Sequence, residues 1–417
     1  MDSAGKFLAI CSRLTQPWDS VDLVGIQEVF RTLAGMKKEG VLAYISLGSN
    51  LGNRAYHLQK SLFSLGERIG EIRSISHVYQ SPAWGFEGGD FLNACVGLQT
   101  GLSPEELLKT LLDIEKEAGR LREPGEGYRS RTLDLDLLYY GSEAIQTTFL
   151  KVPHPSLHKR RFILRPLSDI APQFYHPVLG KDHRNLLQEC RDTTPVEKLP
   201  LRLHATPQEF FTALGFIAIE GNIGAGKTTL ARRISEDLNA KLILERFADN
   251  PFLPKFYEDQ ARYAFPLELS FLADRYQQFI EDTRQLDLFR NFVVSDYDIY
   301  KSLIFAKITL GEEEFRLYRK FFSFMYKEVR KPGLYVYLYQ RTERLLEQIS
   351  RRGRDYEKGI PKEYLEQIQK GYFEFMKNTQ ELNSVIIDVG ELDFVAREGD
   401  YFRVLDQMVA HVLSPFA

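Results

Sequence analysis

The pattern of apolar and polar positions changes character twice along the chain, and its first regular part predicts an α+β domain. Strands are predicted at 41–46, 71–80, 91–100 and 131–140. Between the first two strands, Leu58, Leu62 and Leu65 recur with the spacing of one helix face, and a second helix precedes the last strand. This β-α-β-β-α-β order is typical of ferredoxin-like folds.

The second regular part predicts a different architecture. Short apolar runs with the sequences FIAIE, KLILE, NFVVSD, LYVYLYQ and SVIIDV alternate with long helical stretches. Such alternation is typical of α/β domains with a parallel, doubly wound sheet. Between the two parts the periodicity fades and prolines occur at 195, 200 and 207, as in a linker. We therefore predict an extension of unassigned role at 1–40, an α+β domain at 41–190, a linker at 191–214 and an α/β domain at 215–417.

Composition narrows the class of protein. Of the 417 residues, 44% are hydrophobic and 27% charged, as in globular proteins, and the length suggests more than one domain. The net charge of −3 gives no basic footprint, so neither nucleic acid nor a membrane surface is expected as a partner. The three cysteines lack CxxC spacing, and no apolar run reaches the roughly 20 residues that span a bilayer. We expect a cytoplasmic protein that acts on small molecules.

A phosphate-binding loop is predicted at the start of the second domain. The segment GNIGAGKTT satisfies the pattern GxxxxGK[ST], follows a predicted strand and opens a predicted helix. Backbone N–H groups of such a loop surround phosphates, Lys227 would reach the β- and γ-phosphates of ATP, and Thr228 would bind Mg²⁺. A glycine-rich turn that only caps a helix is the alternative. The predicted ATP contacts are Gly221, Asn222, Gly224, Ala225, Gly226, Lys227, Thr228 and Thr229.

Charged residues downstream of the loop suggest the rest of a kinase site. Glu245 follows a predicted strand, where it could accept a proton from a hydroxyl that attacks the γ-phosphorus; an outer-sphere contact to Mg²⁺ or a solvated strand end are alternatives. The segment RRGRDYE at 351–357 holds three arginines that could close on the transferred phosphoryl group. A solvated basic turn would have the same composition.

Together with NPFLPKFYED and RYAFPLELSFLADRYQQF, these motifs resemble the deoxynucleoside kinases over nearly all of 216–413. The resemblance implies that γ-phosphate passes from ATP to the 5′-hydroxyl of a deoxynucleoside, with one Mg²⁺ at the P-loop. It implies that Glu245 is the catalytic base and that Tyr257 and Glu357 bind the sugar 3′-hydroxyl. Further implied catalytic residues are Lys227 and the lid arginines Arg352 and Arg354, beside Arg351. A homodimer through this domain is also expected.

The sequence departs from the deoxynucleoside kinase pattern at two places. Where many members have an acid followed by Arg and Ser, this chain has Asp296, Tyr297 and Asp298, so a lid arginine would have to replace the missing one. Where many members bind the base with Gln, this chain has Glu268, which only accepts hydrogen bonds when ionised. We expect a purine, either adenine or guanine, as the base.

Two acidic side chains share one face of the predicted strand RTLDLDLLYY. Its period of two places Asp134 and Asp136 together and the leucines opposite. By itself this pattern also fits a solvated strand face. Four arginines precede the two aspartates in the sequence: Arg120, Arg122, Arg129 and Arg131. Their presence favours a site that binds a polyphosphate with metal ions and guanidinium groups together.

With YISLGSNLGNR, FLNA, GRLRE and VPHPSLHKRRFILRPL, this half resembles the hydroxymethyldihydropterin pyrophosphokinases over 42–187. That family transfers pyrophosphate from ATP to a pterin hydroxymethyl group in folate biosynthesis, with two Mg²⁺ ions, here implied on Asp134 and Asp136. The implied pterin contacts are Phe91, Asn93 and Phe162, although both phenylalanines could simply be core. Implied phosphate and nucleotide contacts are Arg120, Arg131, Glu115 and His154. Tyr128 stands where some relatives have Trp.

The interpretation that we carry forward is a bifunctional fusion with two ATP sites. One rival keeps the pyrophosphokinase but makes the second half a different nucleotide kinase, of the thymidylate type. Another rival makes one half an ATP-sensing module without catalysis, because an expected arginine is missing at Tyr297. The sequence predicts neither communication between the sites nor a shared intermediate.

Overall fold

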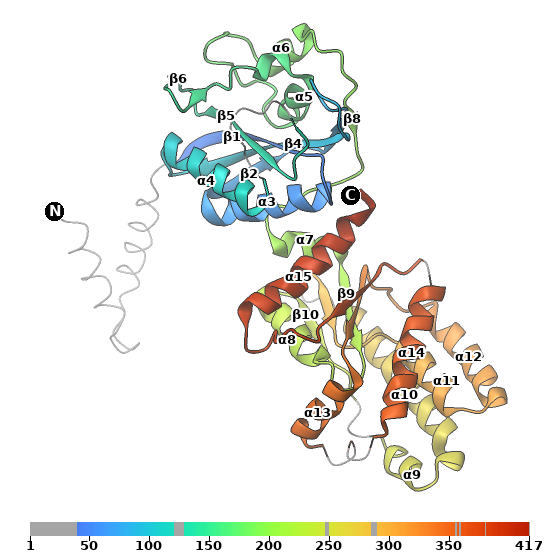
Figure 1. Cartoon of the computed structure of the whole chain (residues 1–417). Coiled ribbons are helices and arrows are strands. Elements are labelled where there is room, and N and C mark those ends of the chain that lie inside the picture. The colour runs from blue at the N-terminus through green and yellow to red at the C-terminus, as the bar shows by residue number, and fades with distance from the viewer. Residues whose placement is uncertain are drawn as a thin grey trace, which may run out of the picture. The chain divides into compact units, whose positions relative to one another are not determined.

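The computed structural model describes residues 40–120, 129–246, 250–284, 290–354, 357, 360–379 and 381–416 (Figure 1). Apart from Gly40, the predicted extension lies outside these residues. The chain divides into two compact units, with the division between Leu203 and His204, and each unit is described by itself.

Unit 1 contains the predicted α+β domain. Its first elements are β1 (Val41–Ser49), α3 (Arg54–Arg68), β2 (Gly70–Ile75), β3 (Tyr79–Ser81), β4 (Phe91–Thr100), α4 (Pro104–Glu117) and β5 (Asp134–Tyr140). They are followed by β6 (Ile145–Gln146), β7 (Lys151–Val152), the 3₁₀ turn η2 (Leu157–Lys159), α5 (Arg161–Ile170), α6 (His183–Glu189) and β8 (Glu197–Lys198). The strand predicted at 71–80 is thus two strands, β2 and β3, which pair with different parts of β4.

The sheet of unit 1 has the order β5-β1-β4-β3-β8, with β2 also paired to β4, and these pairings are antiparallel. Helices α3 and α4 pack on one face (Figure 1), where Leu58, Leu62 and Leu65 are fully buried as predicted. Helix α5 packs on the opposite face against β4, in a core that includes Tyr44 and Tyr139. This arrangement confirms the ferredoxin-like fold.

The segment predicted as a linker at 191–214 is more ordered than expected. Strand β8 adds to the edge of the unit 1 sheet by pairing with β3. Helix α7 (Pro207–Leu214) then begins unit 2, with the Thr206 hydroxyl accepting a hydrogen bond from the Glu209 N–H as its N-cap. The prolines that suggested a linker therefore mark, at Pro207, the first turn of a helix, where proline is well tolerated.

Unit 2 contains the predicted α/β domain. Its first half comprises α7, β9 (Phe216–Gly221), α8 (Lys227–Asp237), β10 (Lys241–Ile243), α9 (Leu253–Glu258), α10 (Gln260–Arg284), β11 (Val293–Ser295), α11 (Tyr300–Thr309) and α12 (Glu312–Tyr326). Its second half comprises β12 (Leu334–Tyr339), α13 (Thr342–Arg352), α14 (Lys362–Asn378), β13 (Ser384–Asp388), α15 (Glu398–Leu413) and the 3₁₀ turn η4 (Ser414–Phe416).

The five strands of unit 2 form a parallel sheet with the order β10-β11-β9-β12-β13. Helices α8 and α15 lie on one side of the sheet, and α10, α11, α12 and α14 lie on the other (Figure 1). After β9 the chain adds strands first on one side of it and then on the other. Such a reversal makes the carboxyl end of β9 the expected ligand site, and the predicted P-loop begins there.

Among the described residues, no helix is both long and apolar enough to cross a membrane.

Candidate functional sites

Strand register places three positions of unit 1 in one row. Gly48 of β1 pairs with Asn93 of β4 on one side and with Asp134 of β5 on the other. Because neighbouring strands lie about 4.8 Å apart, roughly 10 Å separates the backbones at Asn93 and Asp134. A Cβ atom on Gly48 would stand 3.6 Å from the Phe91 ring and 3.8 Å from the Asp134 Cβ. The predicted pterin contact and the predicted metal ligand thus share the sheet face on which α5 packs.

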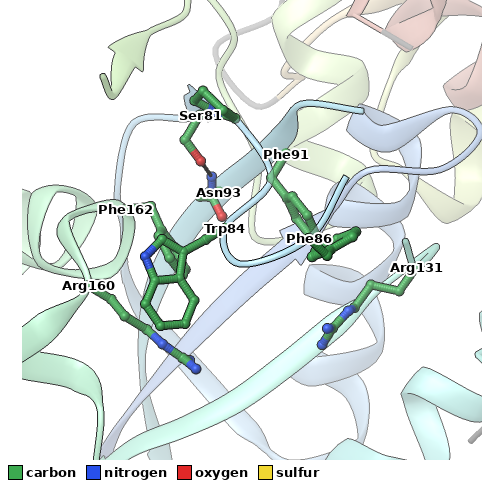
Figure 2. Close-up of a pocket in the computed structure, with 9 residues that line it drawn as sticks. Ser81, Trp84, Phe86, Phe91, Asn93, Arg131, Arg160 and Phe162 are labelled. Atoms are coloured by element: carbon green, nitrogen blue, oxygen red, sulfur yellow. Dashed lines mark hydrogen bonds between the residues drawn. The ribbon is translucent and has the colours of Figure 1, made fainter. Parts of the chain in front are cut away.

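An aromatic pocket lies beside this row (Figure 2). Its lining residues are Ser81, Pro82, Trp84, Phe86, Phe91, Asn93, Arg131, Arg160 and Phe162. All three predicted pterin contacts are among them. The Asn93 side chain is buried and its Nδ2 donates to the Ser81 Oγ at 3.0 Å. Aromatic walls around one fixed amide suit a flat heterocycle with donors and acceptors on its edge.

Arg160 lies between this pocket and β5, which we call the acidic strand because it carries Asp134 and Asp136. Its guanidinium lies 5.3 Å from the Trp84 ring centroid and 5.9 Å from that of Phe162. Its Nη1 also stands 4.0 Å from an Asp136 carboxylate oxygen. A cation at this position can face both an aromatic ring system and a phosphate.

The acidic strand has the predicted alternation, because Leu135 and Leu137 are buried while the two aspartates between and beside them are only half-buried. Arg120 Nη1 donates to Asp134 Oδ1 at 2.5 Å, and Arg131 Nη1 donates to Asp134 Oδ2 at 2.6 Å. Burial acts to raise the pKa of Asp134, but the two guanidinium groups hold that pKa below its usual value. Burial first, and the Asp134 carboxylate second, raise the pKa of Asp136.

These contacts agree with the chemistry of a Mg²⁺ site. Asp134 and Asp136 provide hard oxygen ligands, and no group of three or more His, Cys, Asp or Glu in the described part of the chain forms a complete metal site. Mg²⁺ typically binds one or two carboxylates and completes its coordination with waters and substrate phosphates. The two aspartates therefore suit Mg²⁺ that arrives with ATP.

The two predicted nucleotide contacts of unit 1 have different surroundings. The Glu115 carboxylate is buried, accepts a hydrogen bond from the Leu135 N–H at 2.8 Å and contacts Arg120. It therefore positions Arg120 beside Asp134. Burial lowers the pKa of His154 to about 4, so its ring is neutral near pH 7. The His154 Nδ1 is buried and has no hydrogen-bond partner among the described residues.

The P-loop of unit 2 has the conformation that its glycines predict. Gly224 and Gly226 have φ angles of 86° and 87°, which L side chains rarely adopt. A Cβ on Gly226 would also stand 2.8 Å from the Phe394 ring. Asn222 fixes the loop by donating to the Leu365 carbonyl at 2.7 Å, and Lys227 Nζ donates to the Asn222 carbonyl at 2.9 Å. The lysine is thus held against the loop that would surround the phosphates.

Asp296, which follows β11, joins the P-loop threonine at the start of α8 to Glu245, which follows β10. The Thr228 hydroxyl donates to Asp296 Oδ2 at 2.5 Å, and the Glu245 N–H donates to Asp296 Oδ1 at 2.9 Å. The structure thus brings the P-loop threonine and the predicted catalytic base to one carboxylate, as expected for acids at the carboxyl ends of parallel strands.

Two cations hold the Glu245 carboxylate. Arg275 donates to its Oε1 from Nε at 3.0 Å and from Nη2 at 2.8 Å, and Lys301 Nζ donates to its Oε2 at 2.6 Å. Burial acts to raise the pKa of Glu245, but Lys301 and then Arg275 hold it at about 2. Glu245 is therefore an oriented carboxylate that stays ionised across the physiological range.

Glu268, the predicted base contact, lies on the same face of α10 as Arg275, two helical turns away. Its side chain is buried, and its Oε1 accepts a hydrogen bond from the Thr309 hydroxyl at 2.9 Å. Its Oε2 is buried without a hydrogen-bond partner among the described residues. Burial raises the pKa of Glu268 to about 7 from 4.5. The site therefore contains a carboxyl group that titrates near neutrality.

The titration of Glu268 predicts a pH dependence of stability. Its folded-state pKa of about 7 lies above its unfolded value of 4.5, so the folded unit holds a proton that the unfolded chain releases between these values. The stabilisation is complete below pH 4.5 and is lost as the pH rises to about 7. The loss is on the order of 3 kcal/mol. We expect Glu268→Gln to flatten this decline in calorimetric unfolding of the intact chain, measured on the transition that a deoxynucleoside shifts. A slope equal to that of the wild type would contradict the assignment.

Two of the three predicted lid arginines contact Glu357, a predicted sugar contact. Arg352 Nε donates to Glu357 Oε2 at 3.0 Å, and Arg354 Nη1 donates to Glu357 Oε1 at 3.5 Å. Glu357 is buried. Its predicted partner Tyr257 lies in α9, but the Tyr257 side chain is outside the described part, as are Arg122 and Tyr128.

Sequence reasoning missed several residues that the structure adds to these sites. Trp84, Phe86 and Arg160 line the aromatic pocket, and Arg275 and Lys301 hold Glu245. Arg160 and Arg275 lie inside the motifs VPHPSLHKRRFILRPL and RYAFPLELSFLADRYQQF, so a signal existed for them.

Comparison with known proteins assigns the two parts of the chain to different families, and the division between the two units lies in the interval between the two matches. The profile of the family "Deoxynucleoside kinase" matches residues 217–414, and that of "7,8-dihydro-6-hydroxymethylpterin-pyrophosphokinase" matches residues 44–172. A deoxyguanosine kinase of Bacillus subtilis is 40% identical over 202 residues, covering 47% of this chain and 95% of that protein. A 2-amino-4-hydroxy-6-hydroxymethyldihydropteridine pyrophosphokinase of Aquifex aeolicus is 45% identical over 139 residues, covering 33% of this chain and 85% of that protein.

Among solved structures, a deoxyadenosine kinase of M. mycoides is 25% identical, with a TM-score of 0.40, and the match covers 46% of this chain and 97% of that one. The matched segments of this chain cover 95% of the first relative and 85% of the second, so both activities are present, and both families use ATP and typically Mg²⁺. The chain therefore belongs to two families, as a fusion of a 7,8-dihydro-6-hydroxymethylpterin-pyrophosphokinase with a deoxynucleoside kinase.

Proposed function

We propose that the pterin substrate of unit 1 lies between Phe91 and Phe162, with Asn93 hydrogen bonded to its edge. The observation that supports this proposal is the row Asn93–Gly48–Asp134, which sets a pocket for a flat ring beside a polyphosphate site on one sheet face. The pterin hydroxymethyl oxygen would then face the β-phosphorus of ATP.

We assign the phosphate chemistry of unit 1 to the acidic strand and its arginines. Asp134 and Asp136 would hold two Mg²⁺ ions, which neutralise phosphate charge when bound. Arg120 and Arg131 would leave Asp134 for the phosphates, because metal ions then satisfy the carboxylate they now contact. The pterin hydroxyl oxygen would form a bond to the β-phosphorus and lose its proton to water, while the bond between the β-phosphorus and the oxygen that bridges it to the α-phosphorus breaks and AMP leaves. His154 and Glu115 would orient the nucleotide, the latter through Arg120.

In unit 2 we propose that Glu245 accepts the proton of the nucleoside 5′-hydroxyl. Phosphoryl transfer has a loose transition state, so position and charge matter more than the strength of the base. Lys227, with the P-loop N–H groups, would hold the β- and γ-phosphates, and Thr228 would bind a single Mg²⁺. Arg352 and Arg354 would stabilise the transferred group, while Glu357 and Tyr257 bind the 3′-hydroxyl.

We propose a purine deoxynucleoside as the acceptor. An ionised Glu268 can accept hydrogen bonds from a guanine edge, whereas adenine recognition requires Glu268 to carry a proton. The similarity to a deoxyguanosine kinase agrees with guanine as the preferred base.

A substrate panel tests this proposal against its rivals. The intact chain is assayed for γ-phosphate transfer from ATP to the four deoxynucleosides and to dTMP. We expect kcat/KM for deoxyguanosine or deoxyadenosine to exceed that for either pyrimidine by at least about 100-fold, since a buried polar contact left unpaired is costly. A pyrimidine preference would overturn the purine proposal, and activity on dTMP alone would support the thymidylate-type rival. ATP binding without turnover would support a sensing module.

We also propose that the chain forms a homodimer through unit 2. Leu317, Phe321 and Phe324 are large apolar side chains on one side of α12, and Phe324 is 73% exposed. Sedimentation of the intact chain tests this proposal, and a monomer at micromolar concentration would contradict it. The cytoplasmic location stays a prediction from the sequence.

A further inference from the structure

Lys301 is a buried cation in the kinase site, although no sequence motif indicated a place for it there. It lies in the first turn of α11 and is 8% exposed. Its Nζ donates to Glu245 Oε2 at 2.6 Å, on the oxygen opposite the one that Arg275 binds. Each oxygen of the proposed catalytic base therefore has its own cation.

The charge of Lys301 also reaches the P-loop. Burial first, and the Lys301 ammonium second, lower the pKa of Lys227 to about 8. Lys301 likewise acts to lower the pKa of Glu220, a buried carboxyl on β9. The Lys301 ammonium thus contacts the carboxylate that would take the proton and also acts on the charge of the P-loop lysine.

Tyr297 cannot provide this charge. Its side chain is fully buried, and its ring packs against Phe279 with centroids 5.9 Å apart and planes at 87°. The position at which many deoxynucleoside kinases have an arginine therefore belongs to the core of this chain. Lys301, which follows it in the same segment, brings its positive charge to the Glu245 carboxylate instead.

We propose that Lys301 is a positioning residue for phosphoryl transfer, which holds the Glu245 carboxylate toward the 5′-hydroxyl. The inference rests on the proposed role of Glu245. The 5′-oxygen forms a bond to the γ-phosphorus, its proton passes to Glu245, and the bond between the γ-phosphorus and the bridging oxygen of ADP breaks. Lys301 and Arg275 fix the direction from which Glu245 accepts that proton.

The same helix offers a matched control. Lys307 is also on α11 and also forms an ion pair, with Glu374 Oε2 at 2.7 Å, but its side chain is 57% exposed. An exposed ion pair contributes little to stability. Lys307→Met therefore removes the same charge from the same helix without touching the site.

The experiment measures deoxynucleoside phosphorylation by the intact chain in K301M, K301R and K307M. We expect K301M to lower kcat by about 10- to 100-fold, because a misplaced catalytic group costs that much. We expect K301R to keep most of the wild-type rate and K307M to keep all of it. Equal activity of K301M and wild type would overturn the proposal, as would equal losses in K301M and K307M.

The pH profile separates positioning from a general structural defect. The charged groups that face Glu245 are Lys301, Arg275, Lys227 and Asp296, and the neutral Tyr297 hydroxyl is the further titratable group. Replacing Lys301 removes the cation nearest to Glu245 and should raise the pKa of that carboxyl. The acidic side of the pH profile of kcat/KM should therefore shift to higher pH by about 1 to 3 units. An unchanged acid limb in K301M would contradict the proposal. If K301M does not fold, as judged by calorimetry, the comparison of K301Q with K301R decides the same question.

Measurements in the E245Q variant distinguish failure of this inference from failure of the proposed function. In E245Q, the added K301M substitution should cause little further loss, because the lysine acts through the carboxylate. Additive losses would show that Lys301 acts elsewhere. Full activity of E245Q alone would refute the role of Glu245, whereas loss in E245Q with none in K301M would refute only the inference about Lys301.

Discussion

Replacing Lys227 by alanine is expected to lower kcat/KM for deoxynucleoside phosphorylation by about 1,000-fold and to leave pterin pyrophosphorylation unchanged. The lysine is held at the P-loop by its hydrogen bond to the Asn222 carbonyl, where it can follow the β- and γ-phosphates. Its loss removes positive charge from a site at which the transition state spreads negative charge over the transferred group. Both activities are measured on one preparation, so each serves as the internal standard for the other.

The matched control for this change is Lys362→Ala. Lys362 lies on α14 and forms an exposed ion pair with Glu343 at 2.7 Å. We expect both activities of K362A to equal those of the wild type. Loss of pyrophosphorylation in K227A, in a chain that remains folded by calorimetry, would show that the two sites are coupled and would refute their independence.

The sequence predicted those parts of the fold that local periodicity determines. Leu58, Leu62 and Leu65 are buried together, and Leu135 and Leu137 alternate with two aspartates, because side-chain direction follows directly from helix and strand geometry. The P-loop was predictable for a similar reason, since its glycines and lysine act within one continuous segment.

Contacts between distant segments could not be predicted in this way. The row that joins Asn93 to Asp134 depends on the register of three strands, which no local pattern specifies. Lys301 was missed because a lysine in the first turn of a helix ordinarily faces solvent, and only the packing of α11 against α10 turns it toward Glu245. Helix α7 inside the predicted linker was missed because proline is common both in linkers and at the first position of a helix.

The two units use unlike arrangements to bind the same co-substrate. In unit 2, a backbone loop with one lysine surrounds phosphates, and its acids lie at strand ends. In unit 1, a strand presents carboxylates, and arginines from outside the strand contact them. The phosphate site of unit 1 therefore depends on charged side chains alone. We expect its activity to respond more strongly than that of unit 2 to the replacement of one charged side chain by a neutral one.

That difference leads to the converse expectation for Asp134→Asn. We expect pyrophosphoryl transfer to fall by about 1,000-fold, because a metal-held polyphosphate loses several kcal/mol of transition-state stabilisation with one ligand charge. Asn is isosteric with Asp, and its carbonyl oxygen can still accept a hydrogen bond from Arg120 or Arg131, so the strand should fold. Deoxynucleoside phosphorylation by the same preparation should be unchanged.

The dependence of the pterin pyrophosphorylation rate on Mg²⁺ concentration tests directly whether Asp134 binds metal. If Asp134 holds metal, D134N should require more Mg²⁺ for half-maximal rate, and raising Mg²⁺ should restore part of the activity. The half-buried Asp113 on α4 provides the control, because Asp113→Asn removes a carboxylate of the same unit that is not among the proposed metal ligands. A D134N enzyme with wild-type rate and wild-type Mg²⁺ dependence would contradict the metal-binding role. Asp134 would then belong to a solvated strand face, where its carboxylate only pairs with two arginines.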